Sequence, residues 1–274
     1  LRAQKYALDE SQTKPYFQAD SVLKGVFTAA ERIYGIKIEE APEVEVYNPE
    51  VKAYKLSNAD GSLLGIFYRD YYVRPTKRGG AWMNNFREQE TGVRPIIVNV
   101  CNFPAPSAEV PSQLTIDNVQ TAFHEFGHAL HGFLTQCNYV SVSGTNVSRD
   151  FVEMFSQFNE NFAFVPEILA VYAKDYRNGE PIPAELVEKI RKALQFNQGF
   201  AAGETCAASI LDMKWHELTM EQLAAFNGPD DIRAFEDKVC KEMGLIDEII
   251  PRYRTSYFNH IIASGYSAGY YSYI

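Results

Sequence analysis

Cysteine, histidine and positive charge are all scarce in this chain of 274 residues. The four cysteines stand far apart and none belongs to a CxxC pair, which argues against a zinc knuckle or a dense disulfide framework. We expect them to be reduced and mostly buried. The formal net charge of −9 argues against the clustered lysine and arginine that phosphate binding requires, so nucleic acid is not an expected partner.

Long apolar runs are missing as well. No segment approaches the roughly 20 apolar residues of a membrane-spanning helix, and nothing near the N-terminus has the basic, apolar and small-residue order of a signal peptide. We therefore expect no membrane partner and a cytoplasmic location. The chain begins at Leu1 without methionine and ends abruptly in "YYSYI", so we also expect a fragment that lacks N-terminal and C-terminal parts of a longer chain.

The periodicity of apolar residues changes along the chain. Residues 20–34 have helical spacing, and three alternating segments between Asn, Pro and Gly turns predict a small antiparallel meander. These segments are 43–47, 51–56 and 62–72, and the apolar run at 94–103 predicts a further strand. After the proline-rich residues 104–112 every segment has helical spacing. The expected helices lie near 115–135, 149–162, 164–176, 184–198, 203–215, 220–226, 229–242 and 247–258.

These patterns predict an α+β fold that is predominantly α-helical. A small antiparallel sheet would be followed by a helical bundle. We expect residues 1–110 to form the part that mixes helix and sheet, and residues 111–274 to form the helical part. One helix of the second part contains three histidines, and this helix should hold the functional site.

That helix lies within "QTAFHEFGHALHGFLTQC", residues 120–137. His124 and His128 are four residues apart, so both imidazoles lie on one side of the helix and can reach one metal ion. Glu125 is offset by about 100° and reaches such an ion only through a bound water. This is the HExxH arrangement of a zinc site with a glutamate as general base. The alternative is a helix whose polar residues face solvent or are hydrogen-bonded in the core. His131, three residues past His128, could reach the edge of the site, but we expect it to support the ligands or to be an ordinary polar residue.

Catalytic zinc needs a third protein ligand, and the segment 143–162 offers one. Its predicted helix has a polar stripe of Glu153, Gln157 and Glu160, and a loop rich in Gly, Ser and Asn lets it turn back against the HExxH helix. We expect Glu153 to meet the two histidines. Glu160, two turns further on, is expected to be a hydrogen-bonding or solvated carboxylate. Asp150 is expected to cap the helix, with orientation of an imidazole as the alternative.

Several segments resemble successive motifs of the thimet oligopeptidase family of zinc metallopeptidases, family M3. The main ones are "FHEFGHALHGFL", "SGTNVSRDFVEMFSQFNENF" and "YFNHIIASGYSAGYYSY", and "LRAQKYALDE", "KRGGAWMNNF" and "PRYRTSYF" look similar too. The details are closest to the bacterial peptidyl-dipeptidase branch. The resemblance implies Glu153 as the third zinc ligand, in agreement with the helix argument.

The resemblance also implies that His260, Tyr266 and Tyr273 bind substrate and stabilise the oxyanion. Without it, the Gly-rich and Tyr-rich segment reads as a core helix or loop whose Tyr hydroxyls can donate to a developing negative charge. Family members are much longer and have an N-terminal helical region that walls off one side of a deep channel. The resemblance therefore implies a catalytic-region fragment, which should leave apolar side chains exposed.

The function implied by the resemblance is zinc-dependent hydrolysis of peptide bonds in short peptides, with one Zn²⁺ per chain at the site described above. Release of C-terminal dipeptides, the peptidyl-dipeptidase mode, needs a pocket for the terminal carboxylate. Arg252 and Arg254 are candidates for this pocket, or else plain surface residues. The alternatives are an endo-acting oligopeptidase of the same family, a zinc carboxypeptidase or aminopeptidase, and a metal-free peptide-binding fragment without activity.

Overall fold

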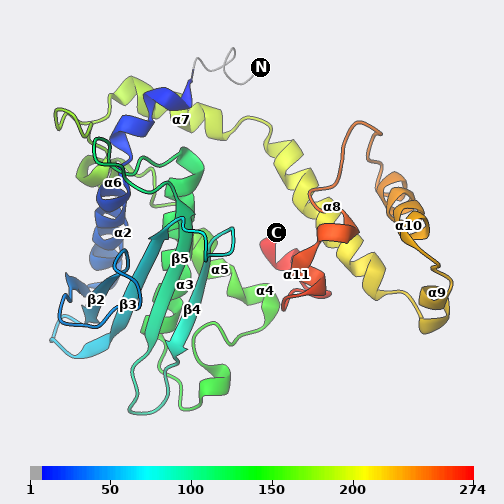
Figure 1. Cartoon of the computed structure of the whole chain (residues 1–274), viewed down its shortest axis with the longest axis horizontal. Coiled ribbons are helices and arrows are strands. Elements are labelled where there is room, and N and C mark those ends of the chain that lie inside the picture. Colours follow the sequence, from blue (N-terminus) through cyan, green and yellow to red (C-terminus); the bar gives the residue numbers. More distant parts are fainter. Residues whose placement is uncertain (1–7) are drawn as a thin grey trace. The chain divides into compact units, whose positions relative to one another are not determined.

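The computed structural model of the chain describes residues 8–274, which form two compact units (Figure 1). The first unit comprises the described residues up to Val147 together with Met154–Leu194. The second comprises Ser148–Glu153 and Gln195–Ile274. Most residues of the family-like segment at 1–10 lie outside the described part. Helices predominate over the strands of one sheet, which confirms the expected helix-rich α+β class.

A five-stranded sheet organises the first unit, with the spatial order β1-β2-β3-β5-β4. The strands are β1 (Lys37–Glu40), β2 (Lys52–Ser57), β3 (Leu63–Tyr72), β4 (Trp82–Arg87) and β5 (Ile96–Phe103). The pairings β1–β2, β2–β3 and β4–β5 are antiparallel, whereas β5 runs parallel to β3. This one parallel pairing arises because the chain passes from β3 to the outer edge, forms β4 there, and returns as β5.

Two expectations for the strands were wrong. Residues 43–47 form turns and irregular structure, because β1 occupies the place beside β2 where they were expected. Tyr47 instead lies against the ring of Tyr68 at 6.2 Å, and its hydroxyl donates to Oδ2 of Asp70 at 2.8 Å. The stretch at 74–86, to which we assigned no strand from the sequence, contains most of β4. Its alternation was hidden by Asn84 and by residues that lie half exposed at the edge of the sheet.

Helix α3 (Ile116–Leu134) packs on this sheet and contains the HExxH segment (Figure 1). It begins with a capping box, in which the Thr115 side chain accepts from the Asn118 backbone and the Asn118 side chain accepts from the Thr115 backbone. Its apolar face is at most 3% exposed and consists of Val119, Phe123, Phe126, Leu130 and Phe133. The ring centroids of Phe126 and Phe67 lie 5.2 Å apart. Burial of this face fixes which side of α3 remains for polar residues.

Helix α5 (Met154–Glu160) crosses α3 at very close range. Gly127 permits this approach, because a Cβ at this position would lie 2.7 Å from both the Phe155 carbonyl oxygen and the Ser156 Cα. The Asn159 amide donates to the Phe123 carbonyl at 2.5 Å and ties the two helices together. The single helix expected at 149–162 is divided into α4 (Arg149–Val152) and α5, with Glu153 between them.

Replacing Gly127 by alanine is expected to force α3 and α5 apart. The added methyl group would overlap backbone atoms of α5, which cannot rotate away, so the free energy of unfolding should fall by about 1–3 kcal/mol. Metal affinity should fall with it, since α5 is joined directly to Glu153. Urea unfolding and zinc titration measure the two effects. Gly203→Ala is the matched control, because its new methyl group would meet nothing within 4 Å apart from its own stretch of α8. Equal unfolding midpoints for the two variants would contradict the packing argument.

The second unit is helical and contains α8 (Gln198–His216), α9 (Met220–Ala224), α10 (Pro229–Glu242) and α11 (Asn259–Ile262). The helix expected at 247–258 was wrong. Only Thr255–Tyr257 form a short 3₁₀ turn, because Pro251 lacks the N–H group that a helix needs there. Across residues 8–274, no helix combines the length and the apolar character needed to cross a bilayer.

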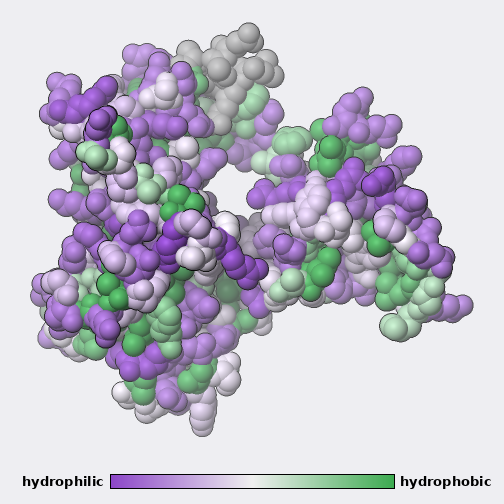
Figure 2. Space-filling view, in the orientation of Figure 1, coloured by the Kyte–Doolittle hydropathy of each residue, from purple (hydrophilic) through white to green (hydrophobic). Residues whose placement is uncertain are grey.

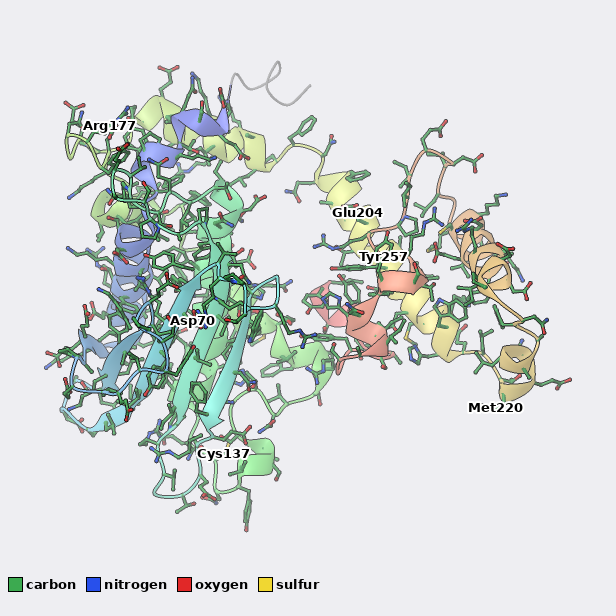
Figure 3. All side chains as sticks on the ribbon, in the orientation of Figure 1. Asp70, Cys137, Arg177, Glu204, Met220 and Tyr257 are labelled. Carbon is green, nitrogen blue, oxygen red and sulfur yellow. The ribbon has the colours of Figure 1, made fainter. Side chains whose placement is uncertain are left out.

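Large apolar side chains are exposed on the second unit, as expected from the resemblance. Met220 is 80% exposed and Tyr257 is 51% exposed (Figure 3). Figure 2 shows apolar side chains, in green, among the hydrophilic surface. Other exposed apolar residues of this unit include Ile246, Ile250, Ile262 and Ile274. Exposed apolar side chains are what the expected incompleteness of the chain predicts.

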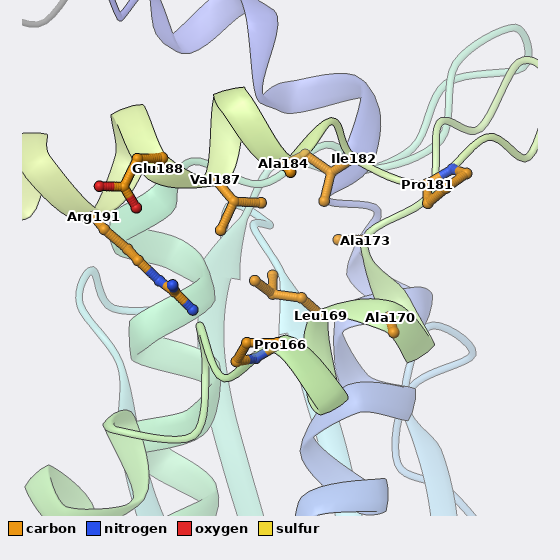
Figure 4. Close-up of a pocket in the computed structure, with 10 residues that line it drawn as sticks. All are labelled: Pro166, Leu169, Ala170, Ala173, Pro181, Ile182, Ala184, Val187, Glu188 and Arg191. Atoms are coloured by element: carbon orange, nitrogen blue, oxygen red, sulfur yellow. The ribbon is translucent and has the colours of Figure 1, made fainter.

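The first unit has a cavity of about 420 Å³ between α6 (Pro166–Tyr172) and α7 (Ala184–Leu194), shown in Figure 4. Its wall is apolar apart from Glu188 and Arg191. None of the residues predicted for the functional site lines it. Both helices are shorter than the sequence predicted, because the segments at 173–183 and 195–197 leave the helical conformation.

All four cysteines are free, as expected, but most of them are not buried. Cys101 is buried on β5, Cys206 is exposed, and Cys137 and Cys240 are partly exposed. Burial, together with the nearby negative charge of Glu125, raises the pKa of the Cys101 thiol well above its usual value. This thiol therefore stays protonated and unreactive at neutral pH.

Candidate metal centre

His124, His128 and Glu153 each offer one ligand atom, and these atoms lie within 4.8 Å of one another. The two imidazole centroids are 5.0 Å apart and their planes are nearly perpendicular, at 82°. The Glu153 side chain belongs to a residue that is only 3% exposed. Two imidazoles and one carboxylate form a donor set that zinc takes in catalytic sites, where a fourth position stays open for water or substrate. The structure thus brings together the three side chains that the sequence predicted as ligands.

A second carboxylate orients one of the imidazoles. Nδ1 of His124 lies 2.7 Å from Oε1 of Glu160 on α5. A neutral imidazole that donates from Nδ1 keeps its lone pair on Nε2, where a metal ion can take it. Glu160 therefore has the hydrogen-bonding role expected from the sequence. Asp150 does not cap the helix, because Ser148 occupies the N-cap position of α4 and Asp150 lies inside the first turn.

Glu125 is a buried residue of α3. It is 5% exposed and directly follows His124, but it is not a member of the group of possible ligands. Its negative charge adds to the effect of burial in raising the pKa values of Cys101 on β5 and Tyr71 on β3. A carboxylate beside the ligands but outside their group suits a proton acceptor better than a ligand.

His131 also lies outside the group of possible ligands, as expected. Its ring packs against Phe155 with a centroid distance of 4.5 Å. Burial, followed by the neighbouring His128, lowers the pKa of His131. The third histidine of α3 is thus a neutral packing residue between α3 and α5.

In the second unit, the segment that follows α11 places tyrosines beside Glu153. The Tyr266 hydroxyl donates to Oε1 of Glu153 at 2.5 Å, and Tyr273 stacks on Tyr266 with a centroid distance of 5.1 Å. The ring of His260 lies 6.0 Å from that of Tyr266 and 6.1 Å from that of Tyr273. The three residues assigned from the family resemblance therefore form one cluster that contacts Glu153 through Tyr266.

The cluster keeps its hydroxyl protons. Burial, and then the hydrogen bond to Glu153, raises the pKa of Tyr266 to about 12. Burial also raises the pKa of Tyr273, followed by the negative charge of Glu153. Burial lowers the pKa of His260, and the positive charge of Arg252 acts in the same direction. At neutral pH the cluster therefore presents two phenol donors and a neutral imidazole.

Asp212 on α8 anchors this segment, although nothing in the sequence pointed to it. Its side chain is fully buried and accepts hydrogen bonds from the backbone N–H groups of Ala268 at 2.9 Å and Tyr270 at 3.0 Å. Ala268 has φ +53°, so the turn is one that a non-glycine residue seldom adopts without support. Asp212 stabilises the turn between the two tyrosines that flank it.

Comparison with known proteins agrees with the assembled residues. A family model described as "Peptidase family M3" matches residues 1–274. The chain is 45% identical over 279 residues to a dipeptidyl carboxypeptidase of Escherichia coli (strain K12), covering 100% of this chain and 40% of that protein. It is 35% identical over 277 residues to an oligopeptidase A of Salmonella typhimurium, and the match covers 98% of this chain and 40% of that protein. A thimet-like oligopeptidase of Dictyostelium discoideum is 31% identical over 285 residues, and the match covers 100% of this chain and 41% of that protein. The chain thus spans about 40% of the length of these relatives.

Proposed function

Because the chain belongs to peptidase family M3, we propose that it hydrolyses peptide bonds with one zinc ion held by His124, His128 and Glu153. The supporting observation is the approach of two imidazoles and a carboxylate to within 4.8 Å of one another. Zinc bound there would polarise the scissile carbonyl and lower the pKa of a water molecule toward neutrality. Glu160 would hold the His124 ring in the orientation that this requires.

The other residues of the site would handle protons and charge. Glu125 accepts the proton of the attacking water and returns it to the leaving amine, a role that typically contributes about 10²- to 10⁴-fold in rate. The hydroxyls of Tyr266 and Tyr273, with the neutral His260, donate to the oxyanion that develops on the scissile carbonyl. In this structure the single hydroxyl proton of Tyr266 is donated to Glu153, so Tyr266 would turn this proton to the oxyanion when substrate binds.

We propose short peptides as substrates and release of C-terminal dipeptides as the reaction of the whole protein. The identity of 45% and 44% to two proteins named dipeptidyl carboxypeptidase, against 35% to an oligopeptidase A, supports this choice. The alternative is an endo-acting oligopeptidase. Since the chain spans 40% of such relatives, the proposal includes further N-terminal and C-terminal parts that complete the protein, in the cytoplasm.

A peptide digest tests the proposal. Peptides with free C-termini are incubated with the zinc-loaded protein, with and without a chelator, and the products are identified by mass spectrometry. We expect dipeptides cut successively from the C-terminus, loss of activity with the chelator and recovery when zinc is added back. Internal fragments would indicate an oligopeptidase, and single amino acids would indicate a carboxypeptidase or aminopeptidase. Intact peptides under every condition would contradict the proposed activity.

A further inference from the structure

Arg149 lies in the second unit at the start of α4, one helical turn before Glu153. Its guanidinium group stacks on the ring of Tyr266, with Cζ 4.7 Å from the ring centroid. Tyr266 in turn donates to Glu153. A single tyrosine therefore contacts both the arginine and a predicted metal ligand.

Two glycines make room for this arginine. A Cβ at Gly265 would lie 2.6 Å from Nη2 of Arg149, and a Cβ at Gly269 would lie 3.0 Å from its Cγ. Any other residue at position 265 would push the guanidinium away from the Tyr266 ring. Asp212 holds the turn that contains Gly269, because it accepts hydrogen bonds from the N–H groups of the residues on either side of this glycine.

The arginine is exposed, and its guanidinium group contacts the face of the Tyr266 ring. Stacking on an aromatic ring occupies the face of the guanidinium and leaves the N–H groups in its plane free to bind an anion. A carboxylate fits these N–H groups, because its two oxygen atoms can accept two parallel hydrogen bonds from the guanidinium group.

The separation of Arg149 from Glu153 suits a peptide that ends two residues after the bond to be cut. Tyr266 separates the two groups, because its hydroxyl contacts the Glu153 carboxylate while the Arg149 guanidinium lies 4.7 Å from its ring centroid. An extended peptide covers about 3.3–3.6 Å per residue, so two residues cover about 7 Å. A peptide whose scissile carbonyl lies at the metal ligand Glu153 would therefore place its terminal carboxylate near Arg149 when two residues follow the cut.

We propose that Arg149 binds the C-terminal carboxylate of the peptide substrate and thereby sets cleavage two residues from the end. This inference rests on the proposed function and names the group that the site recognises. Of the two arginines suggested by the sequence, Arg254 pairs with the buried Glu236 at 2.6 Å and with Asp237 at 3.3 Å. Arg252 lies over the ring of Tyr253 and remains the rival candidate.

The test compares binding of one peptide in two forms, with a free C-terminal carboxylate and with a C-terminal amide. Zinc-loaded protein with the background substitution Glu125→Gln is used, so that bound peptide is not consumed, and Kd is measured by titration calorimetry. We expect the parent to bind the free acid more tightly than the amide, which gives a ratio of the amide Kd to the free-acid Kd above one. Arg149→Gln should lower this ratio by about five- to fiftyfold. Gly265→Ala keeps the charge but displaces the guanidinium, so it should lower the same ratio.

Arg233→Gln is the matched control, because Arg233 is an exposed arginine of the same unit on α10 and should leave the ratio unchanged. The proposal is overturned if the parent does not discriminate between the peptides or binds neither. It is also overturned if Arg149→Gln keeps the ratio, or if the ratio is lost only in Arg252→Gln. A parent that binds with the expected ratio but hydrolyses no peptide without the background substitution would contradict the proposed activity and leave the carboxylate site in place.

Discussion

Replacing Glu125 by glutamine is expected to lower kcat for peptide hydrolysis by about 10²- to 10⁴-fold while the zinc content stays the same. An amide has nearly the shape of the carboxylate but cannot accept the proton of the attacking water. Zinc should remain because Glu125 is not among the three side chains that converge as ligands. Zinc per chain, from elemental analysis, and kcat are measured on the same preparation.

The control for this variant is Glu109→Gln, which removes an exposed carboxylate in the loop before α3. It should change neither zinc content nor kcat. A Glu125→Gln protein that turned over peptides at the parent rate would show that the proton goes to another group. Loss of zinc from the same variant would instead place Glu125 among the ligands.

Replacing His128 by alanine is expected to abolish stable zinc binding and, with it, peptide hydrolysis. Two protein ligands cannot supply the three-ligand site that catalytic zinc occupies. Glu160→Gln should be milder, with a loss of about 10- to 100-fold in zinc affinity, because it weakens only the hydrogen bond that orients His124. Competition titrations against a chelating dye measure both affinities.

His131→Ala is the matched control, since it removes a histidine three residues further along the same helix. Its ring packs on Phe155 and takes no part in the group of possible ligands, so zinc affinity should stay close to that of the parent. Equal losses in the His131 and His128 variants would mean that the ligand set is wrong. A Glu160→Gln protein as defective as His128→Ala would make Glu160 a ligand itself.

The sequence predicted best what depends on local spacing. His124 and His128 fall on one side of α3 because four residues make about one turn, and no tertiary contact is needed to say so. Glu153 could be proposed because its helix had an apolar face and a loop that allowed it to turn back. The packing of the two helices against each other was expected, but their very close approach at Gly127 was not.

Features that depend on partners far apart in the chain were missed. Asp212 accepts hydrogen bonds from backbone groups 56 and 58 residues later, and backbone donors leave no mark on the sequence. The place of the edge strand was also missed, since residues 43–47 and Lys37–Glu40 compete for the same position beside β2. Half-exposed edge strands have weak apolar alternation, so local patterns could not decide between them.

The apolar face of α3 has a practical consequence. Because Phe123, Phe126 and Phe133 are fully buried, the helix is held by its packing against the sheet and does not need an ion to keep its shape. Proteins whose small cores depend on a structural metal unfold when it is withdrawn. Here the two imidazoles should stay in position after dialysis, ready to accept another divalent ion. Cobalt in place of zinc would then turn a colourless protein into one whose visible absorption reports directly on the coordination of the ion.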